Sequence, residues 1–351
     1  MIILIRSLLQ TFLTELLYNM LKNKILNLTF LAPPQYEFLS VSVPKTHVYH
    51  VELNRPDKLN TFTHNSWREL KECFASLSDN PECRVVVLSG KGKHFTAGID
   101  LKSMMAIEMK TQDIDDPARK ARITYKFIED YQAGITALED CIKPVIAVTH
   151  NACIGAGVDL ITAADMRYCT EDSFFQVKEV DVGLAADVGS LQRLPKVIGS
   201  TSIARDLCFT ARKVDSKEAL DIGLVSKVYP NQDSAIKEVL EIAATIASKS
   251  PIAVQTTKMS LVYSQCRTTK DGLRHIVSDT SFFNYGIANS VHTASVKYNF
   301  CINFLPVSMK LDEVITKSVS KPSVISQSSQ SNIQCTVINL YQKKCQQLYP
   351  I

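Results

Sequence analysis

The sequence signals its fold most clearly in Lys143-Pro-Val-Ile-Ala-Val-Thr-His-Asn-Ala-Cys-Ile-Gly-Ala-Gly-Val-Asp159. The β-branched run from Pro144 to His150 is typical of a short buried strand. A loop of small residues follows, and the apolar spacing beyond it predicts a helix over residues 157–164. A strand, a small-residue loop and a helix in this order indicate an α/β fold.

The same alternation of strands and helices extends to both sides of this stretch. Strands are expected over residues 47–53, where apolar and polar residues alternate, and over the β-branched run 84–90. Helices are expected over residues 65–77, 119–140, 201–210, 216–222, 232–249 and 251–264. The sequence therefore predicts an α/β fold made of repeated strand–strand–helix units.

Length and composition bound the class of protein. The chain has 351 residues, which by itself suggests about two domains. With 46% apolar and 21% charged residues it is neither collagen-like, wholly disordered nor a polytopic membrane protein. A net charge of +4 is too small and too dispersed to indicate nucleic-acid binding. The ten cysteines form no CxxC pair, so neither a zinc framework nor a small disulfide scaffold is expected.

The two ends differ in character from the middle. Residues 1–35 are rich in leucine and isoleucine with sparse positive charge, and no run of 18 uncharged apolar residues occurs that could span a membrane. We interpret them as a targeting segment, with a secretory signal or a misassigned start as alternatives. Residues 279–351 include seven serines between positions 318 and 331, which favours a divergent, disordered tail. A core over residues 36–278 remains.

Two small-residue loops follow predicted strands and are candidates for an anion site. The first is Gly90-Lys-Gly-Lys-His-Phe-Thr-Ala-Gly-Ile-Asp-Leu101, and the second runs from His150 to Asp159. Small residues let backbone N–H groups approach a ligand, and two loops could each supply one N–H to an oxyanion. On spacing alone, the simpler interpretation is that Gly98 and Gly157 serve turns.

Acidic side chains downstream are candidates for proton transfer. Glu179 and Asp187 lie eight residues apart, and Asp187 interrupts an apolar stretch in which a carboxylate tends to take up a proton. The alternative is that Glu179 pairs with Lys178 on the surface and Asp187 caps the following helix. The scattered histidines have no metal-ligand spacing, and no GxSxG motif is present, so a metal centre and a serine hydrolase are not indicated.

These residues resemble the crotonase (enoyl-CoA hydratase/isomerase) superfamily. The resemblance rests on the ordered set Leu53-Asn-Arg-Pro56, Phe95-Thr-Ala-Gly-Ile-Asp-Leu101, Lys143-Pro-Val-Ile-Ala147, Cys153-Ile-Gly-Ala-Gly157 and Gln192-Arg-Leu-Pro195. Gly157-Val-Asp159 together with Val177-Lys-Glu-Val-Asp-Val-Gly-Leu-Ala-Ala-Asp-Val-Gly189 is more specific and is similar to the Δ(3,5)-Δ(2,4)-dienoyl-CoA isomerase branch. It implies a crotonase-like spiral of ββα units with a C-terminal helical region.

The resemblance also implies roles for individual residues. Ile99 and Ala156 would hold a thioester carbonyl through their backbone N–H groups. Ala97, Gly98, Ile99, Asp100, Leu101, Ala156 and Gly157 would line the acyl-CoA site. Glu179 would take a proton from C2, Asp187 would deliver one to C6, and Asp159 would tune the pair. No metal or redox cofactor is required, because coenzyme A is part of the substrate.

Departures from the family pattern keep other functions open. Asn151 and Ala156 stand where the family usually has glycines, and Thr61 replaces a usual alanine. An enoyl-CoA hydratase, a Δ3,Δ2-enoyl-CoA isomerase and a non-catalytic acyl-CoA-binding homologue are the alternatives to a dienoyl-CoA isomerase of fatty-acid β-oxidation.

The resemblance implies partners, and the first residues, which could form an amphipathic helix like that of a mitochondrial presequence, indicate a compartment. The partner expected is an acyl-CoA thioester, within a homotrimer or homohexamer and with no nucleic acid and no stable membrane insertion. The expected location is the mitochondrial matrix, with peroxisome or cytoplasm as alternatives.

Overall fold

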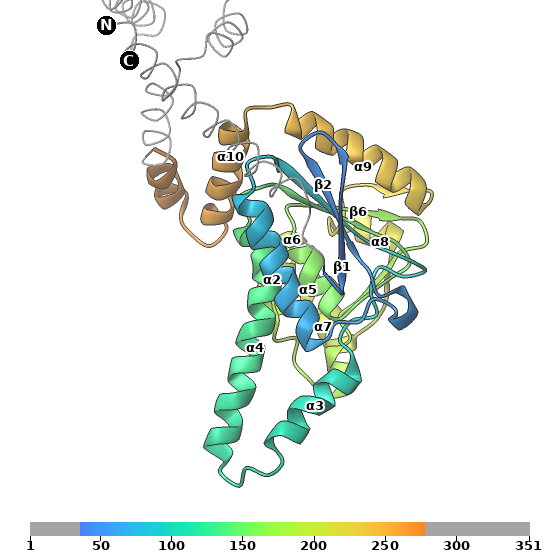
Figure 1. Ribbon diagram of the computed structural model, residues 1–351, viewed down its shortest axis with the longest axis vertical. Coiled ribbons are helices and arrows are strands. Elements are labelled where there is room, and N and C mark those ends of the chain that lie inside the picture. The colour runs from blue at the N-terminus through green and yellow to red at the C-terminus, as the bar shows by residue number, and fades with distance from the viewer. Residues whose placement is uncertain (1–35, 278–351) are drawn as a thin grey trace, which may run out of the picture. The chain divides into compact units, whose positions relative to one another are not determined.

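The computed structural model describes residues 36–277, and the expectations for residues 1–35 and 279–351 lie outside this range. Within it, a six-stranded sheet has the order β1-β2-β3-β4-β6-β9 (Figure 1). Its strands are β1 Leu39–Lys45, β2 Val48–Leu53, β3 Val85–Gly90, β4 Val145–Thr149, β6 Met166–Thr170 and β9 Val228–Tyr229. Only the β1–β2 pair is antiparallel, and the other neighbours in this sheet are parallel.

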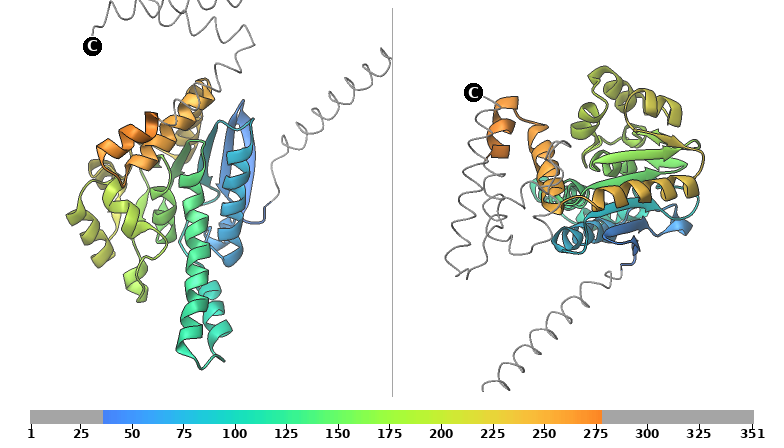
Figure 2. Two further views of the ribbon diagram at one scale, coloured as in Figure 1. Left: turned by 90° about the vertical axis from the view of Figure 1, so that its left-hand side faces the viewer. Right: turned by 90° about the horizontal axis from the view of Figure 1, so that it is seen from above.

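The helices cover both faces of this sheet. They are α2 His64–Asp79, α3 Leu101–Thr111, α4 Pro117–Asp140, α5 Ala156–Thr162, α6 Ser190–Val197, α7 Thr201–Thr210, α8 Ser216–Asp221, α9 Gln232–Ala247 and α10 Pro251–Ser264, with 3-10 turns η1 Pro56–Lys58 and η2 Glu179–Val182. Helix α9 lies along one face of the sheet, while α2, α4 and α5 lie beyond the other face (Figure 2).

The sequence of β3 shows why the sheet is covered twice. All six of its residues are buried, and alternate side chains enter different apolar clusters. Val85 and Val87 pack in the cluster of α9, while Val86 and Leu88 pack in the cluster of α2 and α4. A continuous apolar run of this kind is what a parallel strand buried on both faces requires.

A second, three-stranded sheet carries the loops of the site. It has the order β5-β7-β8, with β5 Ala152–Ile154, β7 Phe174–Gln176 and β8 Val214–Asp215. Strand β5 is followed within two residues by α5, so the small-residue loop between them is held at both ends.

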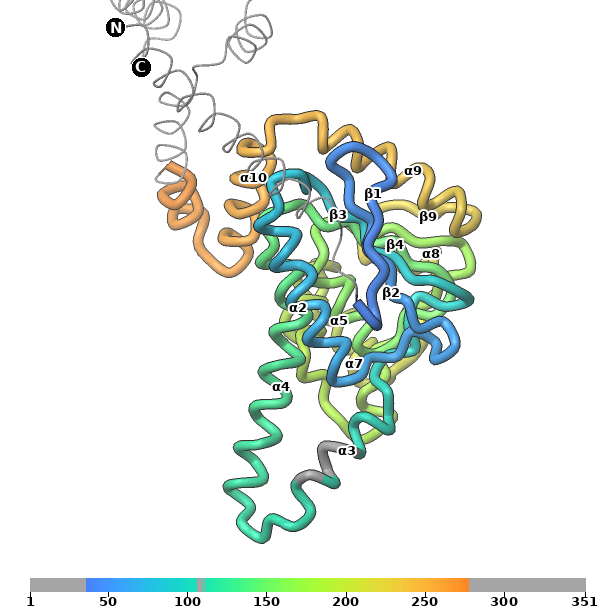
Figure 3. The backbone as a smooth tube through the Cα atoms, in the orientation of Figure 1, coloured from blue at the N-terminus to red at the C-terminus, as the bar shows by residue number. Residues whose placement is uncertain are grey.

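Helices α3 and α4 form a hairpin that projects from the body of residues 36–277 (Figure 3). Residues 90–101 were expected to form a loop, and helix α3 after it was not predicted. Helix α3 is capped by Asp100, whose side chain accepts hydrogen bonds from the N–H groups of Lys102 and Ser103. An aspartate immediately before a helical run is a typical N-cap, so the signal was present in the sequence.

The other expected elements match closely. The helices over 201–210 and 251–264 are found at those bounds, and the helix expected over 157–164 is α5, Ala156–Thr162. Asp215 caps α8 by accepting from the N–H of Glu218.

Helix α10 is tied to the core by a buried lysine. Lys258 Nζ lies 2.8 Å from Asp165 Oδ2 and donates to the carbonyls of Leu138 and Lys143. Its side chain is only 4% exposed, so the charge depends on these three acceptors.

Candidate active site

The two small-residue loops are joined by a short parallel bridge between Thr96 and Cys153. Thr96 N–H donates to the carbonyl of Ala152 at 3.0 Å, and Ile154 N–H donates to the carbonyl of Thr96 at 3.1 Å. The loops expected to supply one N–H each are therefore fixed relative to one another by backbone hydrogen bonds.

The N–H of Ile99 points away from the neighbouring strand-like segment. Phe62 N–H donates to the carbonyl of Gly98, and Asp100 N–H donates to the carbonyl of Phe62, both at 2.9 Å. Because backbone groups alternate in an extended chain, Ile99 between them faces the other side. Gly98 has φ +90°, and a Cβ there would lie 2.9 Å from the carbonyl oxygen of Ile154. The close approach of the two loops thus requires glycine at position 98.

The second N–H comes from Ala156, the first residue of α5. A first helical residue has no partner for its N–H within the helix, and the helix dipole favours negative charge there. Gly155 before it has φ +53°, whereas Ala156 is not among the described residues with positive φ. Its methyl group therefore imposes no left-handed backbone. Asn151, another departure, has φ +47°, a conformation that asparagine adopts more readily than most residues.

A cavity of about 870 Å³ opens between these loops, α2, α4 and the segment after β7. It is lined by Arg55, Lys58, Thr61, Thr63, Trp67, Ala97, Gly98, Ile99, Asp100, Leu101, Lys102, Ser103, Tyr131, Ile154, Gly155, Ala156, Lys178, Glu179, Val182, Leu184, Ala185, Asp187 and Val188. Of the residues expected to contact an acyl-CoA, Gly157 is the one outside this lining. A Cβ at Gly157 would lie 2.5 Å from Thr96 Cγ2, so this glycine lets α5 pack against the first loop.

The carboxylate of Glu179 lies beside Gly155 of the second loop. A Cβ at Gly155 would lie 3.1 Å from Glu179 Oε1, and Glu179 Oε2 is buried with no hydrogen-bond partner among the described residues. Burial, and next the negative charge of Asp159, raise the pKa of Glu179 to about 7. A carboxyl group with this pKa both accepts and releases a proton near neutral pH.

Asp159 lies behind the cavity and is fully buried on α5. Its Oδ1 accepts a hydrogen bond from the N–H of Ser190, the first residue of α6, while Oδ2 has no partner in the described chain. Burial raises the pKa of Asp159 to about 6, against the opposing effect of the Ser190 hydrogen bonds. The structure thus brings Asp159 to Glu179, although 20 residues of sequence separate them.

Asp187 lies in the segment before α6 and lines the cavity. It is exposed, although the residues around it are mostly apolar. Partial desolvation still raises its pKa. Its backbone carbonyl accepts a hydrogen bond of 2.6 Å from Gln132 Nε2 on α4. The tendency to take up a proton that was predicted for Asp187 agrees with its raised pKa, although the residue itself is exposed between the buried Ala186 and Val188.

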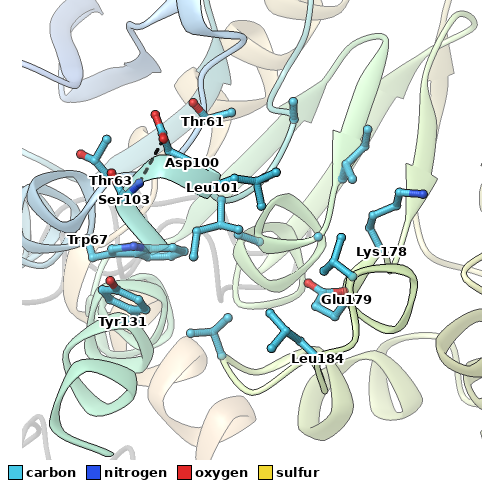
Figure 4. Close-up of a pocket in the computed structure, with 18 of the residues that line it drawn as sticks. Thr61, Thr63, Trp67, Asp100, Leu101, Ser103, Tyr131, Lys178, Glu179 and Leu184 are labelled. Atoms are coloured by element: carbon cyan, nitrogen blue, oxygen red, sulfur yellow. Dashed lines mark hydrogen bonds between the residues drawn. The ribbon is translucent and has the colours of Figure 1, made fainter. Parts of the chain in front are cut away.

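The alternative interpretations, a surface pair of Glu179 with Lys178 and a helix cap at Asp187, are both wrong. Lys178 forms its ion pair with Asp181, not with Glu179. Helix α6 has Gly189 as its N-cap with no side-chain cap, so Asp187 does not cap it. Figure 4 shows the carboxylate of Glu179 beside Leu184 inside the cavity, with the Lys178 side chain turned away from it.

An aromatic wall that was not predicted from the sequence lies opposite Glu179. Trp67 on α2 and Tyr131 on α4 stack with ring centroids 5.0 Å apart, across the cavity from Glu179 (Figure 4). Trp67 lies in the helix expected over residues 65–77, and no local signal connects it with Tyr131. Their pairing depends on the packing of two helices that are far apart in the sequence.

Residues 36–277 contain no group of three or more histidine, cysteine or acidic side chains that could hold a metal ion. No helix in this range is long and apolar enough to cross a membrane. The cysteines described in this part of the chain are free thiols.

Three comparisons with known proteins are informative. The family model described as "Enoyl-CoA hydratase/isomerase" matches residues 44–287. Mitochondrial Δ(3,5)-Δ(2,4)-dienoyl-CoA isomerase of Rattus norvegicus is 52% identical over 243 residues, covering 69% of this chain and 74% of the relative. The peroxisomal enzyme of that name from Arabidopsis thaliana is 45% identical over 231 residues, 66% of this chain and 83% of the relative. The crystal structure of a putative enoyl-CoA hydratase from Streptomyces coelicolor A3(2) superposes with TM-score 0.66 at 27% identity, covering 78% of this chain and 95% of that one.

Proposed function

Because the chain belongs to the enoyl-CoA hydratase/isomerase family, we propose that it is an isomerase that converts 3,5-dienoyl-CoA into 2,4-dienoyl-CoA in fatty-acid oxidation. The crotonase-like α/β fold predicted from the motifs is confirmed by the family match and by the superposed hydratase structure. The names of the relatives support the finer assignment.

One observation carries the proposal: two carboxylates, Glu179 and Asp187, line the same cavity as the backbone N–H groups of Ile99 and Ala156. A reaction that moves a proton along a conjugated chain needs one group to remove the proton and a second group, farther along, to return one. Asp187 supplies the second position, which neither hydration nor a Δ3,Δ2 shift needs.

The proposed chemistry begins at the thioester. The N–H groups of Ile99 and Ala156 donate to the carbonyl oxygen and stabilise the negative charge that develops there when C2 loses a proton. One donor of this kind is worth about 10²–10³ in rate. Glu179 takes the C2 proton, and the electron pair of the broken C–H bond spreads over a dienolate.

The second half of the reaction restores a neutral chain. Asp187 delivers a proton to C6, so the double bonds at C3 and C5 become double bonds at C2 and C4. Glu179 then holds a proton and Asp187 a charge, and proton exchange between them or with solvent returns both to their starting states. Asp159 keeps a negative charge close to Glu179, which favours proton uptake by that group.

The remaining parts of the proposal concern the whole chain. Residues 36–278 form the catalytic unit, residues 1–35 a targeting segment and residues 279–351 a divergent tail. The substrate is an acyl-CoA thioester and no metal or redox cofactor takes part. The assembly is a homotrimer or homohexamer, and the location is mitochondrial, as the name of the rat relative supports.

A conjugation assay tests the function. The full chain is mixed with 3,5-octadienoyl-CoA, and the 2,4-isomer is followed by its ultraviolet absorbance. We expect turnover without added metal. A hydrated product would instead assign a hydratase, and a folded protein that binds the thioester without turnover would assign an acyl-CoA-binding homologue.

A further inference from the structure

Arg193 on α6 does not line the cavity, yet its guanidinium group lies close to the buried Asp159. It belongs to the segment Gln192-Arg-Leu-Pro195, to which the proposed chemistry gives no role. Arg193 Nε donates to Glu139 Oε2 at 2.8 Å, and its Nη2 donates to Thr136 Oγ1 at 3.0 Å. Both partners belong to α4, so the guanidinium is held in one orientation.

The free end of this guanidinium reaches Gly189. A Cβ at Gly189 would lie 2.1 Å from Arg193 Nη1 and 4.0 Å from Asp159 Oδ1. Because Gly189 has no side chain, the guanidinium of Arg193 can approach the carboxylate of Asp159 at this position. Gly189 also has φ +139°, a backbone conformation that other residues rarely adopt.

The burial of Asp159 and its acidic neighbours disfavour its ionised form. Its side chain is fully buried, its Oδ2 has no partner in the described chain, and the acids Glu179 and Asp187 both lie nearby. An isolated buried carboxylate takes up a proton unless a charge or hydrogen bonds oppose it. Besides the hydrogen bond from the Ser190 N–H, the charge of Arg193 favours the ionised form of Asp159.

We propose that Arg193, clamped on α4 by Glu139 and Thr136, is a positioning residue that keeps Asp159 ionised across Gly189 and so sets the charge that acts on Glu179. Arg193 does not line the cavity, so it acts through Asp159 and not on the substrate. The effect on catalysis rests on the proposed isomerase function, whereas the interaction between Arg193 and Asp159 does not.

The test compares thermal unfolding of Arg193→Gln at pH 5 and pH 8 in two backgrounds. The other titratable or charged groups near this pair are Glu139, Asp140, Glu179, Asp187, Cys153, Cys208 and Lys196. The Asp159→Asn background shows whether the pH dependence of Tm comes from Asp159 or from one of these groups. Arg193 stabilises the ionised carboxylate, so its loss costs more above the pKa of Asp159, which is about 6, than below it.

We expect Arg193→Gln to lose about 2–4 °C more in Tm at pH 8 than at pH 5. In the Asp159→Asn background that difference should vanish, and Arg193→Lys should show little of it. Arg212→Gln is the matched control, because Arg212 pairs with Asp206 and Glu218 away from the cluster. Equal losses at both pH values, or the same difference without Asp159, would overturn the proposal.

A kinetic measurement extends the test. If the chain is an isomerase, Arg193→Gln should lower kcat about tenfold with little change in KM, and Arg193→Lys should recover most of it. Inactive wild-type protein would contradict the proposed function, but the unfolding result would remain valid. If Arg193→Gln does not fold, Glu139→Gln replaces it. Its extra loss in Tm at pH 8 should be smaller than that expected for Arg193→Gln, and it should disappear in the Asp159→Asn background.

Discussion

The carboxylate of Glu179 lies directly against the backbone of Gly155, because a Cβ on Gly155 would be only 3.1 Å from Glu179 Oε1. Gly155 is also the residue before Ala156, whose N–H is placed to hold a thioester oxygen. The proposed base therefore lies next to the residue that precedes the proposed oxyanion donor, and we expect a substrate held by its carbonyl to place C2 near Glu179.

The acidic limb of the pH–rate profile should report Glu179. Its pKa of about 7 lies above its ordinary value, and the ionised form is the base, so kcat/KM should fall as pH drops through about 7. In Asp159→Asn the neighbouring negative charge is gone, and this limb should move to lower pH. A limb that stays in place would show that Asp159 does not act on Glu179. Rates measured between pH 5 and 9 decide the matter.

Substitution of Asp187 should separate binding from turnover. Asp187→Asn keeps the size of the side chain but cannot deliver a proton, so the rate should fall about 10²–10⁴-fold while the affinity for a 2,4-dienoyl-CoA changes little. Asp181→Asn is the control, since Asp181 pairs with Lys178 and is outside the cavity lining. Full activity in Asp187→Asn would remove Asp187 from the mechanism.

Gly98→Ala should damage the oxyanion site more than the fold. The substitution forces a methyl group to 2.9 Å from the Ile154 carbonyl at φ +90°, so the loop carrying Ile99 must move. We expect a fall in rate of about 10²-fold. Gly199→Ala has φ +66° with no atom within 4 Å of the new Cβ, and it tests backbone strain alone. Similar rate losses in both variants would argue against a special role for Gly98. Steady-state kinetics and Tm of both proteins are compared.

Lys258 should be the main attachment of α10. Lys258→Met leaves the carboxylate of Asp165 and two carbonyls without the ammonium group, and removing one partner of a buried pair costs about 3–5 kcal/mol. The free energy of unfolding in urea should fall by that order. The exposed pair of Lys45 with Glu241 supplies the control, because Lys45→Met should cost no more than about 1 kcal/mol.

Local patterns were sufficient for most of the described helices, whereas only β2, β3 and β4 among the strands of residues 36–277 were expected. The bounds of α7 and α10 match the expected ranges because their apolar spacing and flanking residues are local signals. Helix α3 was missed although Asp100 provides an ordinary N-cap, since the motif around it was interpreted as a loop. The predicted roles of Ile99, Ala156, Glu179, Asp187 and Asp159 came from the resemblance, and they remain predictions.

The sequence by itself determined the kind of chain this is: an α/β protein with two small-residue loops after strands and the acids 159, 179 and 187 in a recognisable order. These are properties of neighbouring residues, and side-chain chemistry and backbone preference are enough to predict them.

Only the tertiary structure decided which of these groups meet and in what environment. Packing of α4 against α6 and the segment before it brings Gln132 to the carbonyl of Asp187 and Glu139 to Arg193, more than 50 residues away in each case. Burial raises the pKa of Asp159 and Glu179, and partial desolvation raises the pKa of the more exposed Asp187. Desolvation and through-space charge depend on three-dimensional proximity, which no local pattern of residues contains.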